Sequence, residues 1–471
     1  MKQTPAIAVF DIGKTNKKLF LFDEYYRIVW EKSEQFVEIT DNDGDACEDL
    51  DQLTNWITLS LTEVLALPDF SVQAVNFSTY GASLVLIDPA GKPLCPLYNY
   101  LKAYPPTLLQ QFFRKYGPES EITRQTASPS LSSLNSGLQL YRFKYEQPDL
   151  FNRLGYALHL PQYASYLISQ WPVSDLTSIG CHTMLWDFDR QVYHSWVGKE
   201  KLDTRLAPIV PSDSARLVTV NGNSIQVGVG LHDSSAALIP YLASFQEPFV
   251  LISTGTWCVS MNPFNSSPLT PEELQYDCLN YMHYKGQPVK SARLFAGYEH
   301  EHQVKRLADH FQVPIDAYVR VAYDPDLVEQ LRQHVSQVTT EEDAKGKQLL
   351  SMQGSLFGQR DLADFATYEE AYHQLMLDIV AQQLISTNLV LADTSNNRVN
   401  VKRLFVDGGF GKNPIYMNLL AKAFPDIDVY AASVAQASAL GAALAIHSYW
   451  NAQPLPSDCV DLKKYTTSVI A

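Results

Sequence analysis

The chain has 471 residues, more than a single hydrophobic core usually serves, so two or more domains are expected. An apolar share of 46% and a charged share of 18% are ordinary for a globular protein and exclude a disordered chain. The net charge of -15 repels nucleic acid, so an anionic ligand would have to be held by local donors such as loop amides.

Targeting and redox signals are sparse. The six cysteines are scattered without a C-x-x-C pair, which predicts free thiols in a reducing compartment. A short apolar stretch near the N-terminus is interrupted by Asp11, and the sequence has no run of about 18 apolar residues. These features predict a cytoplasmic protein with no membrane segment and no nucleic-acid partner.

The first predicted elements are strands. Residues 6–13, 17–24 and 26–36 have the apolar content and alternation of an antiparallel meander. Farther along, residues 247–264 repeat the form, because an apolar strand leads into a turn of small residues and then into a second strand. Two phosphate-sized turns on two hairpins predict two related domains that face each other.

The remaining elements alternate between helix and strand, which predicts the α/β class. Helices are expected over 49–67, 159–171, 298–311, 368–392 and, rich in alanine, near 433–450, and strands over 72–81 and 403–409. A turn is predicted at Pro89 to Gly91. The domain boundary is placed near residue 243, which gives domains of 1–243 and 244–471.

Two aspartates each carry two interpretations. Asp11 is either a turn residue at a strand end or a carboxylate that holds Mg²⁺ through water, while residues 13–16 cradle phosphate. Asp233 begins a predicted helix, so it is expected to cap free amides there. The same carboxylate could accept a proton from a sugar hydroxyl that attacks phosphorus.

Two further motifs are ambiguous. The stretch 407–414, DGGFGKNP, is either a loop that needs positive φ angles or a place where a flat ring approaches the backbone, with the small-residue helix of 432–445 packed beneath it. His300 and His302 resemble metal ligands, but residues two apart on a helix face different sides. A solvated helix face is therefore expected for both.

The motifs D-I-G-K-T-N, H-D-S-S-A-A, S-T-G-T-W and D-G-G-F-G-K-N occur in one order along nearly the whole chain. In this order they resemble the FGGY carbohydrate kinases, with rhamnulokinases as the most similar branch. The resemblance implies a two-lobed actin-like ATPase (ribonuclease H-like) fold, in which each lobe is a mixed sheet flanked by helices and the active site lies in the cleft between the lobes. It also implies the cofactors ATP and Mg²⁺.

The resemblance assigns residues to roles. Asp233 matches the catalytic base, and Asp11 with Asp233 the metal-linked carboxylates. The positions that match ATP contacts are Gly13, Lys14, Thr15, Asn16, Lys18, Gly255, Thr256, Gly408, Gly409, Lys412 and Asn413. The positions that match sugar contacts are Tyr80, Gly81, Lys102, His232, Asp233 and Ser234.

The chain departs from the family pattern at several positions. Lys14 stands where the first phosphate turn usually has Ser or Thr, so its ammonium either contacts the β or γ phosphate or points from the turn into solvent. Gly81 and Ala82 replace the Met-His pair of xylulokinases, and Ser83 replaces an aspartate of rhamnulokinases. Lys102 lies near the place of a family arginine. These departures leave the identity of the sugar open.

The sequence therefore predicts an ATP-dependent kinase that phosphorylates a hydroxyl of a ketose such as rhamnulose, fuculose or a related pentulose or hexulose. Two alternatives remain, an ATPase of the same fold without sugar transfer and an inactive sugar- or ATP-sensing module. The predicted partners are ATP and the small sugar, with a homodimer left open.

Overall fold

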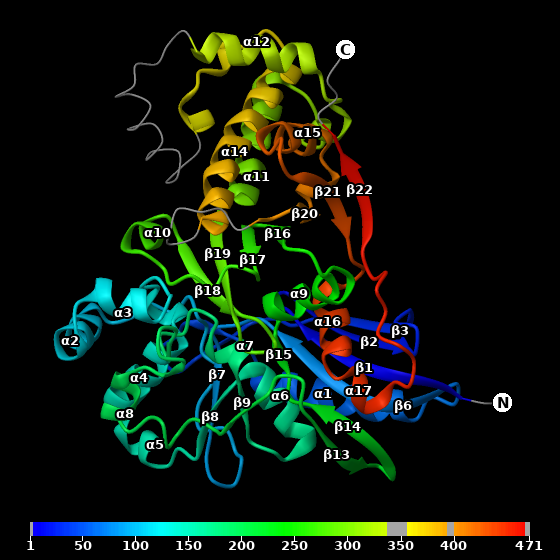
Figure 1. Ribbon diagram of the computed structural model, residues 1–471. Coiled ribbons are helices and arrows are strands. Elements are labelled where there is room, and N and C mark those ends of the chain that lie inside the picture. The colour runs from blue at the N-terminus through cyan, green and yellow to red at the C-terminus, as the bar shows by residue number, and fades with distance from the viewer. Residues whose placement is uncertain (1–2, 337–355, 393–399, 467–471) are drawn as a thin grey trace.

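The computed structural model describes residues 3–336, 356–392 and 400–466, and it arranges them in two lobes (Figure 1). Within these residues each lobe is built on a seven-stranded sheet. The first sheet has the strand order β13-β14-β6-β1-β2-β3, with β15 paired to β6. The second has the order β18-β19-β17-β16-β20-β21-β22 and forms the upper lobe in Figure 1.

The strands up to residue 232 are β1 Thr4–Ile12, β2 Asn16–Asp23, β3 Ile28–Gln35, β4 Ile39–Thr40, β5 Ala46–Cys47, β6 Phe70–Thr79, β7 Leu84–Ile87, β8 Tyr156–His159, β9 Ser174–Asp175, β10 Trp186–Asp187, β11 Val192–Tyr193, β12 Ile209–Val210, β13 Ala215–Val220, β14 Asn223–Gly228 and β15 Leu231–His232. The helices of this part are α1 Leu50–Leu65, α2 Pro106–Tyr116, α3 Glu119–Gln125, α4 Ser136–Glu146, α5 Pro148–Asn152, α6 Leu160–Ser169, α7 Leu176–Ile179 and α8 Ser195–Lys199.

The later strands are β16 Phe249–Thr254, β17 Cys258–Asn262, β18 Cys278–Met282, β19 Pro288–Leu294, β20 Arg403–Gly408, β21 Asp428–Ser433 and β22 Asp461–Tyr465. The later helices are α9 Asp233–Ser244, α10 Pro271–Gln275, α11 Ala296–Phe311, α12 Pro325–Ser336, α14 Tyr368–Leu391, α15 Pro414–Ala423, α16 Ala437–Ala445 and α17 His447–Trp450.

The central strands of the first sheet, β1 and β6, are buried on both faces, and strand alternation decides which side chain faces which layer. Ala8 and Phe10 of β1 pack with α1 and α6 on one face. Ile7 and Val9 point to the other face, where they share a core with α9 and α16. Helix α1 begins where the side chain of Asp49 accepts a hydrogen bond from the Gln52 amide at 2.9 Å.

The second sheet repeats the central arrangement of the first. Strand β1 pairs antiparallel with β2 and parallel with β6, while β16 pairs antiparallel with β17 and parallel with β20. Helices α11, α14 and α15 contribute to the core on one face of this sheet. The predicted pair of related α/β domains, each with a mixed sheet and helices, is thereby confirmed.

Helices α9 and α16 cross between the two sheets, side by side in Figure 1. A Cβ atom added to Gly441 of α16 would lie 1.8 Å from the carbonyl oxygen of Ala236 in α9, so the crossing needs a glycine. The amide of Asn76 in β6 also donates to the Ala442 carbonyl at 2.7 Å. Helix α16, although it follows strands of the second sheet in the chain, thus contributes to the core of the first lobe.

This position corrects one expectation. The small-residue helix was expected beneath the glycine pair of 407–414, but α16 contacts β1, β6 and α9 instead, and α15 follows that loop. The helix expected over 433–450 is also divided, because residues up to Ser433 belong to β21 and α16 ends at Ala445 before α17 begins. The backbone of Gln436 is left-handed just before α16.

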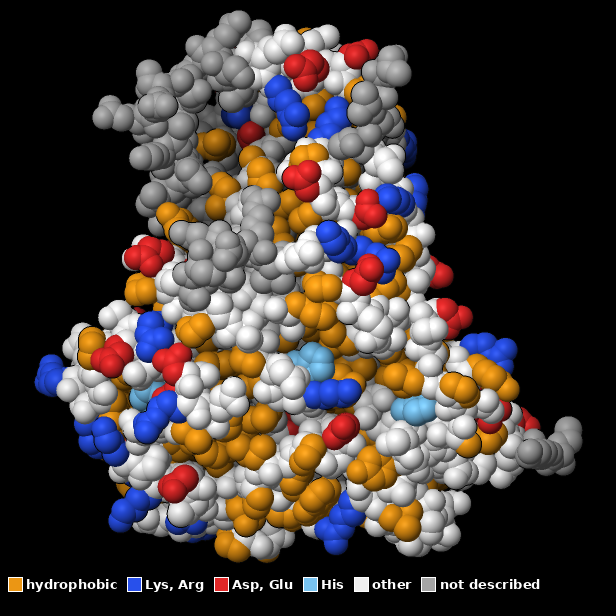
Figure 2. Space-filling model, viewed as in Figure 1, with side chains coloured by type: hydrophobic (Ala, Val, Ile, Leu, Met, Phe, Trp, Pro, Cys, Tyr) orange, Lys and Arg blue, Asp and Glu red, His pale blue; other side chains and the backbone are white. Residues whose placement is uncertain are grey.

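Among the described residues, the structure contains no helix long and apolar enough to cross a membrane. Figure 2 shows one face, on which Lys and Arg side chains are interspersed with Asp and Glu over both lobes.

Candidate active site

Neighbouring parallel strands bring the predicted site residues to one edge of the first sheet. Asp11, near the end of β1, lies opposite Ser78 of β6, and His232, at the end of β15, lies opposite Thr79. The carboxyl ends of parallel strands are where open α/β sheets bind ligands. The pairing therefore places Asp11 and the start of α9, with Asp233, at the same edge.

The surroundings of Asp11 disfavour the charged form of its carboxyl group. Burial raises the pKa of Asp11 to about 6, and the nearby charge of Asp233 acts in the same direction. The Ser438 hydroxyl donates to Oδ1 at 3.0 Å, and Lys18, opposite Asp11 in the β1–β2 ladder, also favours the charged form. A partly buried carboxylate within electrostatic range of another carboxylate is suited to a cation with oxygen ligands.

Asp233 is the first residue of α9, and more than a third of its side chain, 37%, is exposed. Its Oδ1 accepts a hydrogen bond from the Ser234 amide at 2.6 Å and lies 3.2 Å from Nε2 of His232. It accepts from the next residue, whereas a capping side chain accepts from an amide two or three residues on. The carboxylate is thus oriented yet open to a ligand.

The His232 ring orients Asp233. Burial lowers the pKa of His232, which favours the neutral ring, and its Nδ1 has no hydrogen-bond partner among the described residues. A proton on Nδ1 would be an unsatisfied buried donor, so the tautomer with Nε2–H, donating to Asp233, is favoured. The ring is 5.5 Å from that of Tyr281, which comes from the opposite lobe.

Gly81 is required by this packing. An added Cβ atom would lie 2.9 Å from Cδ2 of His232 and 3.1 Å from Sγ of Cys181. The next residue, Ala82, has a φ of 59°, an uncommon conformation for a residue with a side chain. The predicted sugar residues Gly81, His232, Asp233 and Ser234 are therefore adjacent, while the sugar contact itself stays a prediction.

The first phosphate turn is closed by the Gly13 amide, which donates to the Asn16 carbonyl at 2.9 Å, and Thr15 and Asn16 are exposed. Lys14 forms an ion pair next to this turn, and its contact with phosphate stays a prediction. Its ammonium lies 2.8 Å from a carboxylate oxygen of Glu38 and about 6 Å from the ring centres of Tyr80 and Tyr100. Lys18, and not Lys14, has its charge beside Asp11.

A buried ion pair beneath this turn was missed by the sequence analysis. Lys17 Nζ lies 2.5 Å from Glu48 and donates to the Lys14 carbonyl at 3.1 Å. Glu48 also accepts a hydrogen bond from the Tyr80 hydroxyl. The hydroxyl of Tyr80 is thereby directed into the protein, and the only sequence signal was a lysine at an inward position of β2.

The second phosphate turn and the glycine pair lie together at the edge of the second sheet. Thr254 of β16 is paired with Gly408 of β20. The Thr254 hydroxyl donates to the Asp407 carbonyl at 2.5 Å and accepts from the Phe410 amide at 3.1 Å. Gly408 has a φ of +91°, and its added Cβ atom would lie 1.9 Å from the Thr254 carbonyl oxygen. The residues Gly255 and Thr256 are exposed beside this link.

A cavity of about 440 Å³ opens next to these two loops. It contains four predicted ATP residues, Gly255, Gly409, Lys412 and Asn413, together with Thr254, Gly297, His300, Tyr318, Val319, Phe410 and Pro414. Asn413 caps α15 and donates to the Tyr372 hydroxyl at 2.7 Å. The expected loop with positive φ and the expected ring-sized space thus coexist.

His300 corrects another expectation. It lines this cavity, and its Nε2 is 3.0 Å from the Tyr372 hydroxyl, so it does not belong to a solvated face. Burial lowers its pKa to about 4, which makes the ring neutral near pH 7. His302 is exposed, as expected. The periodicity of α11 could have placed His300 on the inner side with Val304.

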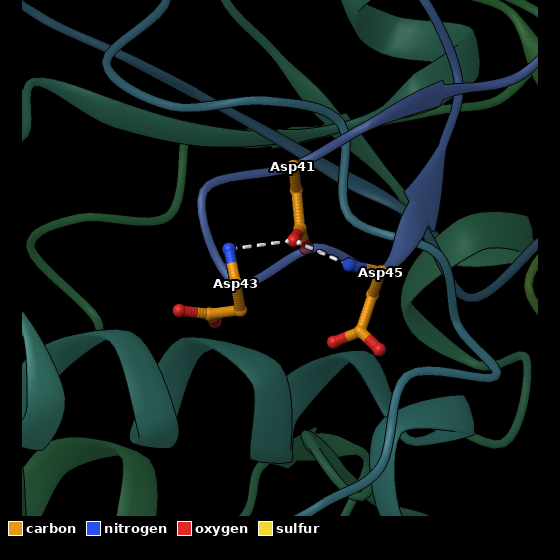
Figure 3. A group of neighbouring side chains, drawn as sticks. All are labelled: Asp41, Asp43 and Asp45. Atoms are coloured by element: carbon orange, nitrogen blue, oxygen red, sulfur yellow. Dashed lines mark hydrogen bonds between the residues drawn. The ribbon is translucent and has the colours of Figure 1, made fainter.

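Lys102 lies in a group of three carboxylates, Asp41, Asp43 and Asp45, which Figure 3 shows around one loop. Its ammonium pairs with Asp41, with Asp43 at 2.8 Å and with Asp45 at 2.9 Å. Oδ1 of Asp41 also accepts the amides of Asp43 and Asp45. These carboxylates compete for the ammonium that was predicted to contact sugar.

Comparisons with known proteins agree with this geometry. The family model of the FGGY carbohydrate kinases, N-terminal domain, matches residues 6–237, and the model described as carbohydrate kinase FGGY, C-terminal domain, matches residues 246–341. The chain belongs to the FGGY family of carbohydrate kinases. It is therefore an ATP-dependent sugar kinase with the two-lobed, actin-like fold of that family.

Solved structures of low identity share the fold. A carbohydrate kinase from Novosphingobium aromaticivorans has a TM-score of 0.78 at 22% identity, over 99% of this chain and 95% of that one. A xylulose kinase from Lactobacillus acidophilus has a TM-score of 0.75 at 14% identity, over 98% of this chain and 94% of that one. A glycerol kinase from Plasmodium falciparum with ADP has a TM-score of 0.70 at 14% identity, over 95% of this chain and 90% of that one. The names of these proteins do not support the rhamnulokinase branch over others.

Proposed function

We propose that the chain transfers the γ-phosphoryl group of ATP to a hydroxyl of a ketose, in the range of rhamnulose, fuculose and related pentuloses or hexuloses. The observation that carries the proposal is the pair of carboxylates at one sheet edge. Asp233 is open and oriented by its neighbours, whereas Asp11 is shielded and electrostatically linked to it.

In this proposal Asp233 accepts the proton of the attacking hydroxyl, and His232 keeps the carboxylate in place. Asp11 offers carboxylate oxygens in a shielded position, so it is the residue suited to hold Mg²⁺. When bound, the ion would neutralise phosphate charge. The amides of the turn at Gly13 and of the turn at Gly255 are the donors available to phosphate oxygens. The cavity at Gly409 and Asn413 is the proposed adenosine site.

The sugar is chosen by fewer features. Two residues that are predicted to contact the sugar offer it few polar groups. Packing requires the glycine at Gly81, and the hydroxyl of Tyr80 points inward because it is hydrogen-bonded to Glu48. The absence of the Met-His pair at Gly81 and Ala82 disfavours xylulose. The domain boundary near residue 243, a homodimer and a cytoplasmic location stay predictions.

A screen for ADP release in the presence of ketoses, polyols and sugar acids tests the proposal. We expect a ketose to raise ADP release well above the rate without acceptor, with a phosphorylated sugar as the product. ADP release that no acceptor stimulates would overturn sugar transfer to a ketose. Strong stimulation by glycerol or gluconate alone would overturn the ketose assignment.

A further inference from the structure

We infer that Lys14 and Glu38 recognise the acceptor sugar, so that the first phosphate turn serves both substrates: its backbone faces ATP and its lysine faces the sugar. The inference rests on the proposed function, because it assigns residues to the acceptor of that reaction. It is an alternative both to a contact of Lys14 with the β or γ phosphate and to a lysine that only faces solvent.

The main chain of Lys14 is fixed from the protein interior. The Lys17 ammonium, itself almost completely buried, donates to the Lys14 carbonyl at 3.1 Å. Glu48 neutralises Lys17 at 2.5 Å and also accepts from the Tyr80 hydroxyl. A buried charge pair with further hydrogen bonds resists movement, because breaking it would leave a charge unpaired. The turn is therefore tied to the residue that precedes Gly81.

The side chain of Lys14 extends from this anchored turn toward Tyr80, one of the residues predicted to contact the sugar. Its ammonium lies 2.8 Å from Glu38, 5.9 Å from the ring centre of Tyr80 and 6.0 Å from that of Tyr100. Glu38 also accepts from the amide of Asn99 at 3.3 Å, which brings the segment of Tyr100 against the turn. The two tyrosine rings are 6.0 Å apart.

The charges of Lys14 and Asp233 both act on Tyr100. Burial raises the pKa of Tyr100. The positive charge of Lys14 lowers this pKa, whereas the negative charge of Asp233 raises it. The phenol thus lies within electrostatic reach of the proposed base and of the lysine. Lys18, by contrast, acts on Asp11.

The ion pair has unused hydrogen-bonding capacity. The side chains of Lys14 and Glu38 are 26% and 46% exposed, so both can bind a ligand without unfolding. An ammonium has three donors and a carboxylate has about four acceptor sites, of which the pair uses few. An ammonium and a carboxylate beside aromatic rings suit the vicinal hydroxyls and C–H faces of a sugar.

The test compares Lys14 of the turn and Lys18 of β2 with Lys32 of β3, which is assigned to neither substrate. With the acceptor found by the screen, we expect Lys14→Met to raise KM for the sugar by about 10–100-fold, the effect of losing a hydrogen bond to a charged group, while KM for ATP stays within about twofold. Lys18→Met should raise KM for ATP instead. Lys32→Met is the matched control, because Lys32 is 30% exposed and pairs with Glu63 at 2.9 Å; it should change neither constant.

Two further measurements separate the outcomes. Calorimetric binding of MgADP to Lys14→Met needs no acceptor, and an affinity weakened as much as in Lys18→Met would overturn the inference alone. Glu38→Gln should repeat the sugar-specific effect, and deoxy analogues of the acceptor should lose affinity for the wild type but not for Lys14→Met. Failure of the screen to find any acceptor would overturn the proposed function and this inference with it.

Discussion

At the scale of single residues, Asp233 is the most sharply defined group of the site. We expect Asp233→Asn to lower kcat by about 10²–10⁴-fold, because the amide keeps the shape of the side chain but cannot accept the proton. MgADP binding should persist, which calorimetry can check. A variant that turned over near the wild-type rate would show that another group is the base.

Asp11 should make the protein sensitive to pH. Its pKa of about 6 in the folded chain exceeds the ordinary value of 3.8, so folding favours the protonated form. The stability it contributes to the ligand-free protein is complete below pH 3.8 and is lost as pH rises through about 6. Thermal unfolding between these values, compared with Asp11→Asn, measures this difference.

The same carboxyl predicts how Mg²⁺ acts. Below about pH 6 a proton competes with the metal, so the Mg²⁺ concentration for half-maximal rate should rise by roughly tenfold per pH unit. Asp11→Asn should weaken Mg²⁺ dependence more than sugar binding. An Mg²⁺ titration that is unchanged in Asp11→Asn would return Asp11 to the interpretation of a turn residue.

At the scale of elements, the crossing of α9 and α16 packs the sheet edge that carries Asp11 and Asp233 against the core shared by both sheets. Alanine normally favours a helix interior over glycine by about 1 kcal/mol, so propensity alone predicts that Gly441→Ala stabilises the protein. Overpacking predicts the opposite sign, because the new Cβ atom would lie 1.8 Å from the Ala236 carbonyl oxygen. We expect a net loss of about 1–3 kcal/mol.

Gly198 of α8 is the control for this prediction, since an added Cβ atom there meets no atom within 4 Å. Denaturant unfolding of both variants should give changes of opposite sign. Because Ala236 lies in the first turns of α9, Gly441→Ala should also lower kcat through displacement of Asp233. A Gly441→Ala variant as stable and active as wild type would contradict the close crossing.

At the scale of the whole molecule, the proposed adenosine cavity belongs to the second sheet while Asp11 belongs to the first. A nucleotide that spans both should stabilise the protein more than its nucleoside. At about 100 times its Kd, MgADP should add about 2.7 kcal/mol, and adenosine at the same concentration should add less. Thermal shift assays of wild type and Asp11→Asn would measure the stabilisation by each ligand. Equal shifts with MgADP and adenosine would contradict a site that spans the lobes.

Much of this fold could be predicted from the sequence, because strand alternation and helical periodicity are local properties. The hairpin at Asp11, the hairpin at Gly255, helix α14 and the glycine loop at Gly408 all occur where the pattern indicated. The order of the motifs indicated the family. These elements bury apolar side chains at fixed spacings, and their backbone turns need glycine at fixed positions.

The tertiary structure alone decided which side chains meet. The Lys14 ammonium pairs with Glu38, the Lys102 ammonium with three aspartates and the His300 ring with Tyr372, and no local pattern specifies these partners. Helix α16 lies against the first sheet, where it contacts β1, β6 and α9, and no local pattern specifies this placement. The sequence by itself determined the elements and the candidate aspartates, because these follow from local patterns. Long-range packing and charge pairing determined which partners each polar side chain has.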